Sequence, residues 1–528
     1  MKFIRPFVPI SIIVIVWVYL ARSLFGPWFL PTHDGEYHII RFMEFYRVLA
    51  SGILIPRWAP TLNSGFGIPI FIFHYPFPNY VSAFLHMFGM QFVDTLKISM
   101  SLGYLVASLT CFYFLRRYFS RFSSVFGTLA MMGVPYWFVD LLVRGSVGEV
   151  WAIAWVFVGL AAIAWGRKAL FSVALALLVL SHNILALLFF PLFLFVLFWQ
   201  SKKDFLPWVV LGIGMSTFFW LPALYERQFV VGLNTVNFRD HFAQLYELLI
   251  PSWGTEFSAG SGFGNKMSFQ VGIGPLLLLI FALLILIKEK NTRMKKTATI
   301  TLIGLCGAVF FMLPYSAFIW ERLGFLQYAQ YPWRLLSFVI PATAWIGAYV
   351  FSHIPRKFSV GIILLCIGII IPYTAGVRYA RRDDNYYQSR RNFTDGTSSM
   401  GNSFSTIWTP WKETRANSPI TAPDFVEVTQ INKSPTHITA RIKSSKEAII
   451  TINTIYYPGW SAIIEGIKRN VGKTSDGLIQ VNVPPGAYNI RIFFTETPIR
   501  LVGDMISFIS LLTVVMFLIK TVLSEKYK

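Results

Sequence analysis

The chain has 528 residues, of which 55% are hydrophobic and only 13% are charged. Soluble domains carry about 25% charged residues, so most of this surface cannot face water. The formal net charge of +21 does not indicate a nucleic-acid partner, because the Lys and Arg clusters lie in short segments between apolar runs, as in cytoplasmic loops of membrane proteins.

These apolar runs predict a polytopic α-helical membrane protein. Several approach the roughly 20 residues that cross a bilayer, and a backbone in lipid must be helical to satisfy its own polar groups. Alternating the runs with basic segments predicts about twelve crossings and a multi-pass location in the plasma membrane, with both termini in the cytoplasm. The basic segments are Arg116–Arg117, Arg167–Lys168, Lys202–Lys203, Lys288–Lys296 and Arg356–Lys357.

Residues 1–375 are predicted to form the main transmembrane module. Its first crossing ends near Phe25 and leads into a long outer loop, 26–91. The end of that loop, 79–90, is apolar but too short to span, so we expect it to lie in the membrane interface. The apolar segment 169–199 has basic residues at both ends, which requires an even number of crossings. A helical hairpin turning at Ser181-His182-Asn183 is therefore predicted.

The composition changes at residue 376. Polar residues alternate with Val, Ile, Tyr and Phe in 448–455, 478–483 and 488–494, between turns that contain Gly and Pro. Such alternation is typical of an antiparallel β-sandwich, which we expect over residues 376–500 on the extracytoplasmic side. Residues 501–528 are predicted to form a last transmembrane helix and a cytoplasmic tail.

Two acids follow the first helix directly. Asp34 and Glu36 lie among His33, Tyr37 and His38, in a loop that is otherwise apolar and aromatic. One interpretation is an exposed acidic loop. The other is a pair of carboxylates that acts as a general base or binds a divalent cation such as Mg or Mn. Zinc binding by the two histidines would lack a third ligand.

Three further groups of polar residues stand at predicted helix ends. Arg144 and Glu149 form either a local ion pair or a phosphate-binding cation with a second acid. His182 and Asn183 serve either a helix–helix hydrogen bond or a ligand. Arg334 either extends its head group to the interface or clamps an anionic lipid head group.

The segment from Thr32 to His38 resembles the first extracytoplasmic loop of the GT-C superfamily of membrane glycosyltransferases. More closely, other stretches resemble YfhO-type and 6-pyruvoyl-tetrahydropterin synthase-related membrane proteins. They are Pro56–Pro60 with Gly65–Pro69 and Tyr75–Pro78, then Arg144–Glu149, and Tyr456–Trp460 with Val483–Gly486. Together these stretches extend over nearly the whole chain.

The resemblance implies a transferase that takes a sugar from a polyprenyl-phosphate donor in the membrane and passes it to a glycan, lipid or protein acceptor. Asp34 matches the catalytic acid of such enzymes, and Glu36 and Glu149 are further candidates for the catalytic site. The second Asp-rich motif of oligosaccharyltransferases is not found. Candidates for the donor phosphate are Arg57, Arg144, Arg334 and His182. Candidates for the acceptor are His38, Asn183, Trp58 and Tyr331, and Tyr457 and Trp460 of the β domain are expected to contact an acceptor glycan.

Two other classes of function fit the same composition. A transporter or flippase of lipid-linked glycans would use the same basic groove without catalysis, but its charges should lie near mid-membrane at broken helices. A structural assembly factor would leave the acids solvated. The charges here fall mainly at the outer ends of predicted helices, which favours the enzyme.

Overall fold

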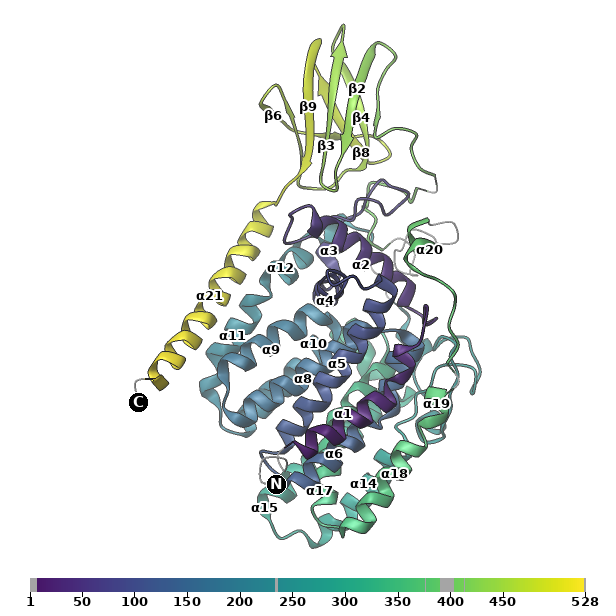
Figure 1. The fold of residues 1–528 in the computed structure, drawn as a ribbon, viewed down its shortest axis with the longest axis vertical. Helices are drawn as coiled ribbons and strands as arrows, with labels where there is room; N and C mark the ends of the chain where they lie inside the picture. Colours follow the sequence, from purple (N-terminus) through teal and green to yellow (C-terminus); the bar gives the residue numbers. More distant parts are fainter. Residues whose placement is uncertain (1–6, 233–235, 376, 390–402, 413, 527–528) are drawn as a thin grey trace.

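The computed structural model of the chain describes residues 7–232, 236–375, 377–389, 403–412 and 414–526. A helical bundle forms the larger part of the molecule, and a β domain stands at one end of it (Figure 1). The last helix, α21 (Pro498–Lys526), runs back from the β domain along the bundle and packs against α11 (Leu206–Met215) and α12 (Thr217–Glu226).

The remaining helices belong to the bundle and to its loops. They are α1 (Val8–Leu20), α2 (Gly35–Ala50), α3 (Ile70–Phe73), α4 (Phe77–His86), α5 (Phe92–Leu115), α6 (Arg121–Met132), α7 (Pro135–Phe138), α8 (Val147–Trp165), α9 (Lys168–Ser181), α10 (Asn183–Trp199), α13 (Leu245–Leu249), α14 (Ile273–Lys288), α15 (Thr292–Met312), α16 (Ala317–Arg322), α17 (Val339–Phe351), α18 (Arg356–Gly368), α19 (Ile371–Ala375) and α20 (Asp384–Ser389).

Six described helices are long and apolar enough to cross a membrane, and the number is eight if each of two bent pairs is one span. One pair joins α6 to the segment Pro135–Arg144 with a bend of 48°, and the other joins α11 to α12 with a bend of 62°. Helices α1, α9, α10 and α14 are apolar but shorter. The number of twelve crossings stays a prediction.

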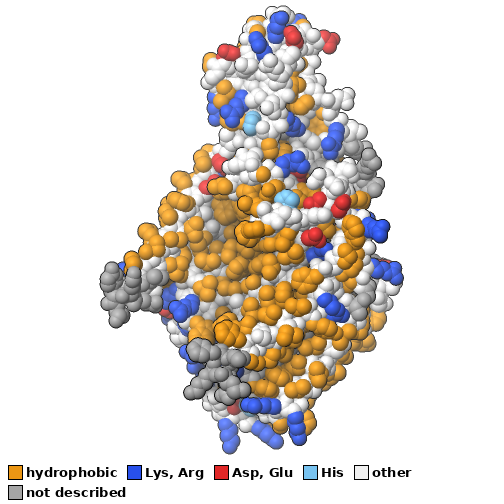
Figure 2. Space-filling model, viewed as in Figure 1, with side chains coloured by type: hydrophobic (Ala, Val, Ile, Leu, Met, Phe, Trp, Pro, Cys, Tyr) orange, Lys and Arg blue, Asp and Glu red, His pale blue; other side chains and the backbone are white. Residues whose placement is uncertain are grey.

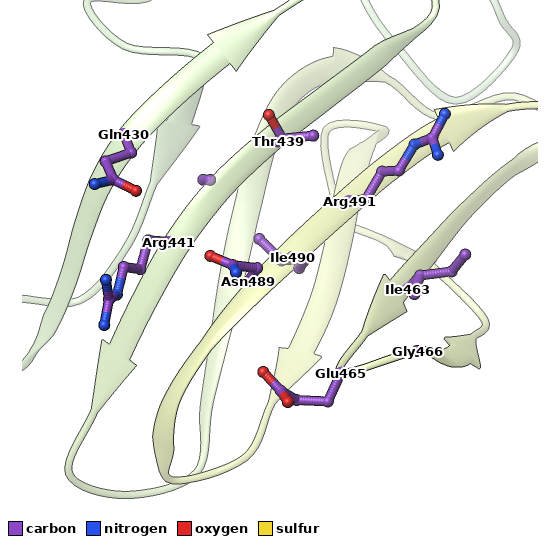
Figure 3. Close-up of a pocket in the computed structure, with 10 residues that line it drawn as sticks. Gln430, Thr439, Arg441, Ile463, Glu465, Gly466, Asn489, Ile490 and Arg491 are labelled. Carbon is purple, nitrogen blue, oxygen red and sulfur yellow. The ribbon is translucent and has the colours of Figure 1, made fainter.

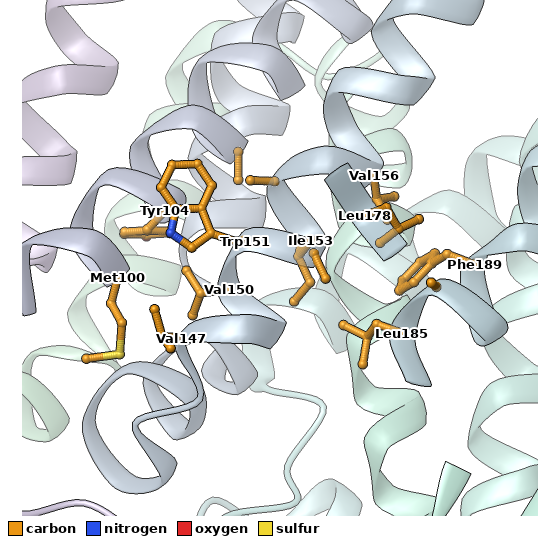
Figure 4. Packing of buried hydrophobic residues seen from close by; sticks show 14 of the residues in the cluster. Met100, Tyr104, Val147, Val150, Trp151, Ile153, Val156, Leu178, Leu185 and Phe189 are labelled. Carbon is orange, nitrogen blue, oxygen red and sulfur yellow. The ribbon is translucent and has the colours of Figure 1, made fainter. Parts of the chain in front are cut away.

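The surface agrees with a membrane location. A broad apolar band covers the middle of the visible face, and Lys and Arg side chains gather at the end remote from the β domain (Figure 2). The core within this band is densely packed. Met100 and Tyr104 of α5 lie beside Val150 and Trp151 of α8 (Figure 4), and all four side chains are buried. Which side of the membrane each end faces stays a prediction.

Two predictions for the bundle can be compared directly with its helices. The apolar segment 169–199 does break at His182, where α9 ends and α10 begins. The segment 26–91 is not mainly irregular, since it contains α2, α3 and α4. Of these, α4 has ten residues, too few to span a bilayer, which agrees with an interfacial segment.

The β domain consists of two antiparallel sheets, as the alternating pattern predicts. One has the strand order β1-β4-β8-β7 and the other β2-β3-β9-β5-β6. Their inner faces are apolar, with Ile438, Ile450 and Ile490 buried between them. The strands are β1 (Ile420–Thr421), β2 (Val426–Lys433), β3 (His437–Ser444), β4 (Ala448–Ile455), β5 (Trp460–Ile464), β6 (Ile467–Arg469), β7 (Gly472–Lys473), β8 (Leu478–Val483) and β9 (Gly486–Phe494).

A buried ion pair joins the β domain to the bundle. Arg500 at the start of α21 donates from Nε and Nη2 to the two carboxylate oxygens of Glu226 in α12, at 2.8 and 2.9 Å. The Tyr457 hydroxyl donates to the same carboxylate at 2.9 Å. Tyr457 and Trp460 are only 0% and 6% exposed. The prediction that these two side chains contact an acceptor glycan is therefore wrong, because both are buried, Tyr457 against this ion pair.

Candidate functional site

Helix α2 carries three polar residues on one face. Asp34, His38 and Arg41 are spaced i, i+4 and i+7, which places them in one row along the helix. Asp34 is the N-cap residue of α2, yet its carboxylate makes no capping hydrogen bond. It is half-buried and has no hydrogen-bond or ion-pair partner among the described residues. An Asp at the N-cap usually accepts a hydrogen bond from the first turn of the helix, and Asp34 does not. Its carboxylate is therefore available to a ligand.

Arg41 is the second unusual group on this face. Eleven Asp, Glu, Lys and Arg side chains are buried in the described part of the chain, and ten of them form an ion pair. The ten are Glu44, Arg57, Lys97, Asp140, Arg144, Glu149, Glu226, Glu247, Arg334 and Arg500. Arg41, at 6% exposure, is the exception, and its Nε is buried without a hydrogen bond. Burying a charge without a partner lowers the free energy of unfolding by roughly several kcal/mol. We therefore expect an anionic ligand to be the partner of Arg41.

Two histidines and a tyrosine lie beside Arg41. The ring centroids of His38 and His74 are 5.8 Å apart, and those of His74 and Tyr75 are 4.1 Å apart. Burial lowers the pKa of both histidines well below 6.5, and the Arg41 charge lowers it further. Both imidazoles are therefore neutral at pH 7. Neither ring nitrogen of His74 has a partner among the described residues, so this histidine can both donate to and accept from a ligand.

The second part of the site is a buried network around Glu149 of α8. Arg144 donates from Nη2 to Glu149 Oε1 at 2.8 Å and from Nη1 to Asp140 at 2.6 Å. Arg334 donates from Nε to the same Oε1 at 2.8 Å, and the Tyr136 hydroxyl donates to Oε2 at 2.8 Å. Two arginines thus balance two acids, and both oxygens of Glu149 are occupied. Glu149 thus anchors the two arginines, and its role in the catalytic site stays a prediction.

Each arginine of this network keeps one edge unbonded. Nη2 of Arg334 and Nε of Arg144 have no hydrogen-bond partner among the described residues, while Nη1 of Arg334 donates to the Ala329 carbonyl at 2.7 Å. The Trp333 ring lies under both guanidinium groups, at 4.9 Å from Arg144 and 5.9 Å from Arg334. Tyr331 stacks on that ring with centroids 5.0 Å apart. This packing fixes the planes of the two guanidinium groups.

Two glycines bring these parts together. Gly145 has φ +67°, and a Cβ on it would lie 2.3 Å from Oγ1 of Thr32, just before Asp34. A Cβ on Gly148 would lie 2.5 Å from the Tyr75 ring. The backbone N–H of Asp34 donates to the Arg144 carbonyl at 2.8 Å. A side chain at position 145 or 148 would clash with Thr32 or Tyr75. The two glycines therefore allow the Arg144–Glu149 segment to contact both the start of α2 and Tyr75.

His182 connects the two parts. Its Nε2 lies 3.7 Å from Oε1 of Glu149, and its ring centroid lies 5.3 Å from that of Tyr75. Its Nδ1 accepts a hydrogen bond from the Leu185 backbone at 3.2 Å, which caps α10. His182 thus ends one helix, caps the next and lies beside Glu149, and its role as a ligand contact stays a prediction. Asn183 is exposed, and its Oδ1 accepts from the Ile184 backbone at 3.1 Å.

Three other candidates lie in different surroundings. Arg57 is 3% exposed and donates to Asp504 at 2.7 Å, to the Phe218 carbonyl at 2.7 Å and to Glu496 at 3.4 Å. These bonds tie the segment after α2 to α12 and α21, and they leave little of the guanidinium for a phosphate. Trp58 is 1% exposed and packs against Trp460. Glu36 forms an ion pair with Arg382.

The expected cation site is not assembled in the described part of the chain. No three His, Cys, Asp or Glu side chains converge there as metal ligands. Glu36 pairs with Arg382 instead of sharing a cation with Asp34. Among the described residues, Asp34 and Glu36 therefore share no ready-made cation site, and binding of Mg or Mn stays a prediction.

Sequence reasoning missed Arg41, His74 and Tyr75. A signal for Arg41 was present, since Gly35–Ala50 has the hydrophobic period of a helix, which aligns positions 34, 38 and 41. His74 and Tyr75 lie between α3 and α4 and come near Arg41 only through the fold. No local pattern would have revealed that contact.

No protein-family model and no curated protein matches the chain. Among solved structures, the chain is similar to arabinofuranosyltransferase AftD from Mycobacteria, with 14% identity, a TM-score of 0.44, and coverage of 69% of this chain and 26% of that one. It is also similar to ArnT from Cupriavidus metallidurans bound to undecaprenyl phosphate, with 15% identity, a TM-score of 0.40, and coverage of 72% and 68%. The chain thus spans about a quarter of the AftD structure. Because these TM-scores are low, we draw no functional conclusion from the likenesses.

Proposed function

We propose that the chain is a membrane glycosyltransferase of the GT-C type, which moves a sugar from a polyprenyl-phosphate donor to an acceptor on the extracytoplasmic side. The observation that carries this proposal is the face of α2. It combines a carboxylate without a partner, Asp34, with the one buried cation that lacks an ion pair among the described residues, Arg41. Sugar transfer from a phosphate donor needs two groups: a base that accepts the proton of the acceptor hydroxyl, and a cation that binds the leaving phosphate.

In the proposed reaction, Asp34 accepts the proton of the acceptor hydroxyl while the hydroxyl oxygen attacks the anomeric carbon of the donor sugar. The bond between that carbon and the phosphate oxygen breaks, and the polyprenyl phosphate leaves with the electron pair. A positioned carboxylate base contributes ~10²–10⁴-fold to such a step. Asp34 and Arg41 are two helical turns apart, about 10 Å along the axis, a span that a sugar phosphate and the long Arg side chain can fill.

Arg41 and the Glu149 network have different roles in this proposal. Arg41 supplies positive charge that no ion pair among the described residues neutralises. Arg144 and Arg334 are neutralised by Asp140 and Glu149, so they add oriented N–H donors at their unbonded edges. Donors that are fixed before the reaction stabilise the leaving phosphate without reorganisation. Glu149 acts by holding the arginines.

The surroundings of the site suggest how substrates bind. The apolar band in Figure 2 is a surface along which a polyprenyl chain can lie. We place the acceptor near His38 and Tyr331, which border the Asp34 and Arg334 parts of the site. Asn183, which is exposed, is a further acceptor contact. Glycan, lipid and protein acceptors all present a suitable hydroxyl. The proposal also places the β domain outside and both termini in the cytoplasm.

The alternative is a flippase or transporter of lipid-linked glycans, and one observation favours it. Arg144 lies at the end of a bent helix pair and His182 lies at a break between two helices. Broken helices that carry polar groups are typical of transporter binding sites. A transporter would bind the same phosphate but would release the lipid with its sugar still attached.

The test uses the purified protein in lipid nanodiscs with a panel of polyprenyl-phosphate sugars and a mixture of acceptors. Asp34→Asn should lower transfer by ~10²-fold or more while donor binding is kept. The matched control is Asp424→Asn, an exposed acid of the β domain, which should transfer as the wild type does. Full transfer by Asp34→Asn would refute the base assignment. Sugar movement across proteoliposomes without any transfer would favour the transporter.

A further inference from the structure

The β domain contains a groove of its own, and none of the residues that line it belongs to the site on α2. It has a volume of about 570 Å³ and lies on the five-stranded sheet (Figure 3). Figure 3 shows Gln430 and Arg441 on one side of it, Glu465 and Gly466 on the other, and Asn489 between them. The groove therefore crosses strands β2, β3, β9 and β5.

The strand register explains why polar side chains meet there. Residues paired across antiparallel strands point to the same face of a sheet. Arg491 pairs with Thr439 on one side and with Ile463 on the other, and Ile463 pairs with Lys468. Arg441 pairs with Asn489 in the next row. The alternate residues, such as Ala440 and Ile490, are buried between the two sheets. Arg441, Arg491 and Lys468 therefore all point to the outer face of the sheet.

Two backbone irregularities bound this face. The register between β2 and β3 shifts between Thr429 and Asn432, and Gln430 has φ +50°. On the opposite side, Glu465 and Gly466 have φ +50° and +78° in the tight turn from β5 to β6. A β-bulge bends its strand and increases the local twist. The bulge in β2 and the turn after β5 therefore border the groove on opposite sides.

Neither arginine of the groove forms an ion pair among the described residues. Arg441 and Lys468 have no ion-pair partner among the described residues, and the cationic contact of Arg491 is with the Phe493 ring, at 5.7 Å. Glu465 is the one acid among the residues that line the groove. Guanidinium groups bind carboxylate and phosphate oxygens in pairs, and the amides of Gln430 and Asn489 suit hydroxyl groups.

Two other kinds of ligand fit less well. Neutral sugars are usually held by stacking on aromatic rings, and none lines this groove. A peptide that adds to a sheet needs a free strand edge, whereas β3, β9 and β5 in the floor already have neighbours on both sides. Recognition must therefore come from side chains, across a groove open along the surface.

We propose that this groove binds a segment of an acidic glycan polymer, a chain of sugar or polyol units with oxyanion groups at intervals. The oxyanions contact Arg441 and Arg491, and sugar hydroxyls contact Asn489 and Gln430. This site is independent of the transfer reaction proposed above. It lets the β domain bind an anionic glycan at a distinct surface.

The experiment measures binding to the full-length protein in detergent by calorimetry. The probes are an oligogalacturonate for carboxylates, an oligo(glycerol phosphate) for phosphates, a neutral maltooligosaccharide and an oligoglutamate. We expect at least one of the two acidic probes of sugar or polyol to bind, more weakly as salt rises. The double variant Arg441→Gln/Arg491→Gln should bind it roughly tenfold or more weakly, and the neutral probe should not bind.

A charge-matched control separates the groove from general basicity. Lys446→Gln/Lys473→Gln removes two exposed cations of the same domain that lie outside the groove, and it should bind as the wild type does. Equal weakening by both double variants, failure of both acidic probes to bind the wild type, or equal affinity for oligoglutamate would each overturn the proposal. Sugar transfer is scored separately, so this result and the test of Asp34 can fail independently.

Discussion

Buried arginines with and without a partner should respond to mutation with opposite signs. Arg500 is 0% exposed and forms two hydrogen bonds to Glu226. Replacement by Met leaves the Glu226 carboxylate buried without its cation, which costs about 3–5 kcal/mol. Arg41 forms no ion pair among the described residues, so its removal leaves no paired acid behind. Arg41→Met should therefore stabilise the ligand-free protein by about 1–3 kcal/mol, the cost of an unsatisfied buried polar group.

The measurement is the apparent unfolding temperature of the purified proteins in one detergent, followed by tryptophan fluorescence. Arg41→Met should unfold above the wild type and Arg500→Met below it. Arg41→Met should also lose binding of a polyprenyl phosphate, since that lipid is the proposed partner. A more stable but inactive variant is the signature of a group retained for function. If Arg41→Met lowers the unfolding temperature as Arg500→Met does, Arg41 is a structural cation and the case for an anion at α2 fails.

Three further predictions concern the same site. Burial holds the pKa of His38 and His74 below 6.5, so the unfolded chain binds more protons below that pH. Stability should therefore be full above about pH 6.5 and fall on acidification, and His74→Gln should flatten this dependence in unfolding experiments. Gly145→Ala, at φ +67° with Thr32 in the way, should destabilise the protein by about 1–3 kcal/mol and lower transfer; a neutral result would contradict the close approach. Glu149→Ala should lower stability by about 3–5 kcal/mol, because it leaves buried arginines without their acid, and a stable variant that lost only transfer would restore Glu149 as a catalytic residue.

Local sequence patterns predicted helices and strands well where the pattern depends only on neighbouring residues. Period-two alternation marked Ala448–Ile455 as a strand, and basic residues at both ends of 169–199 required the break that lies at His182. The role of Arg57 could not be predicted in this way, because its partner Asp504 is 447 positions further along the chain. The occupied oxygens of Glu149 were equally hidden, since Arg334 reaches it from 185 positions away.

The pairing of buried charges supports a ligand at α2 more strongly than the presence of acids does. Every other buried guanidinium in the described chain has a counter-charge, as Arg500 has in Glu226 and Arg57 has in Asp504. A fold that leaves Arg41 without one, beside a carboxylate that does not cap its helix, has two local conflicts on a single helical face. Such conflicts persist where something outside the chain resolves them, and natural proteins concentrate them at functional sites. One phosphate would supply the anion that Arg41 lacks, and one hydroxyl would supply the donor that Asp34 lacks. These are the two groups that a donor and an acceptor bring to the transfer of a sugar.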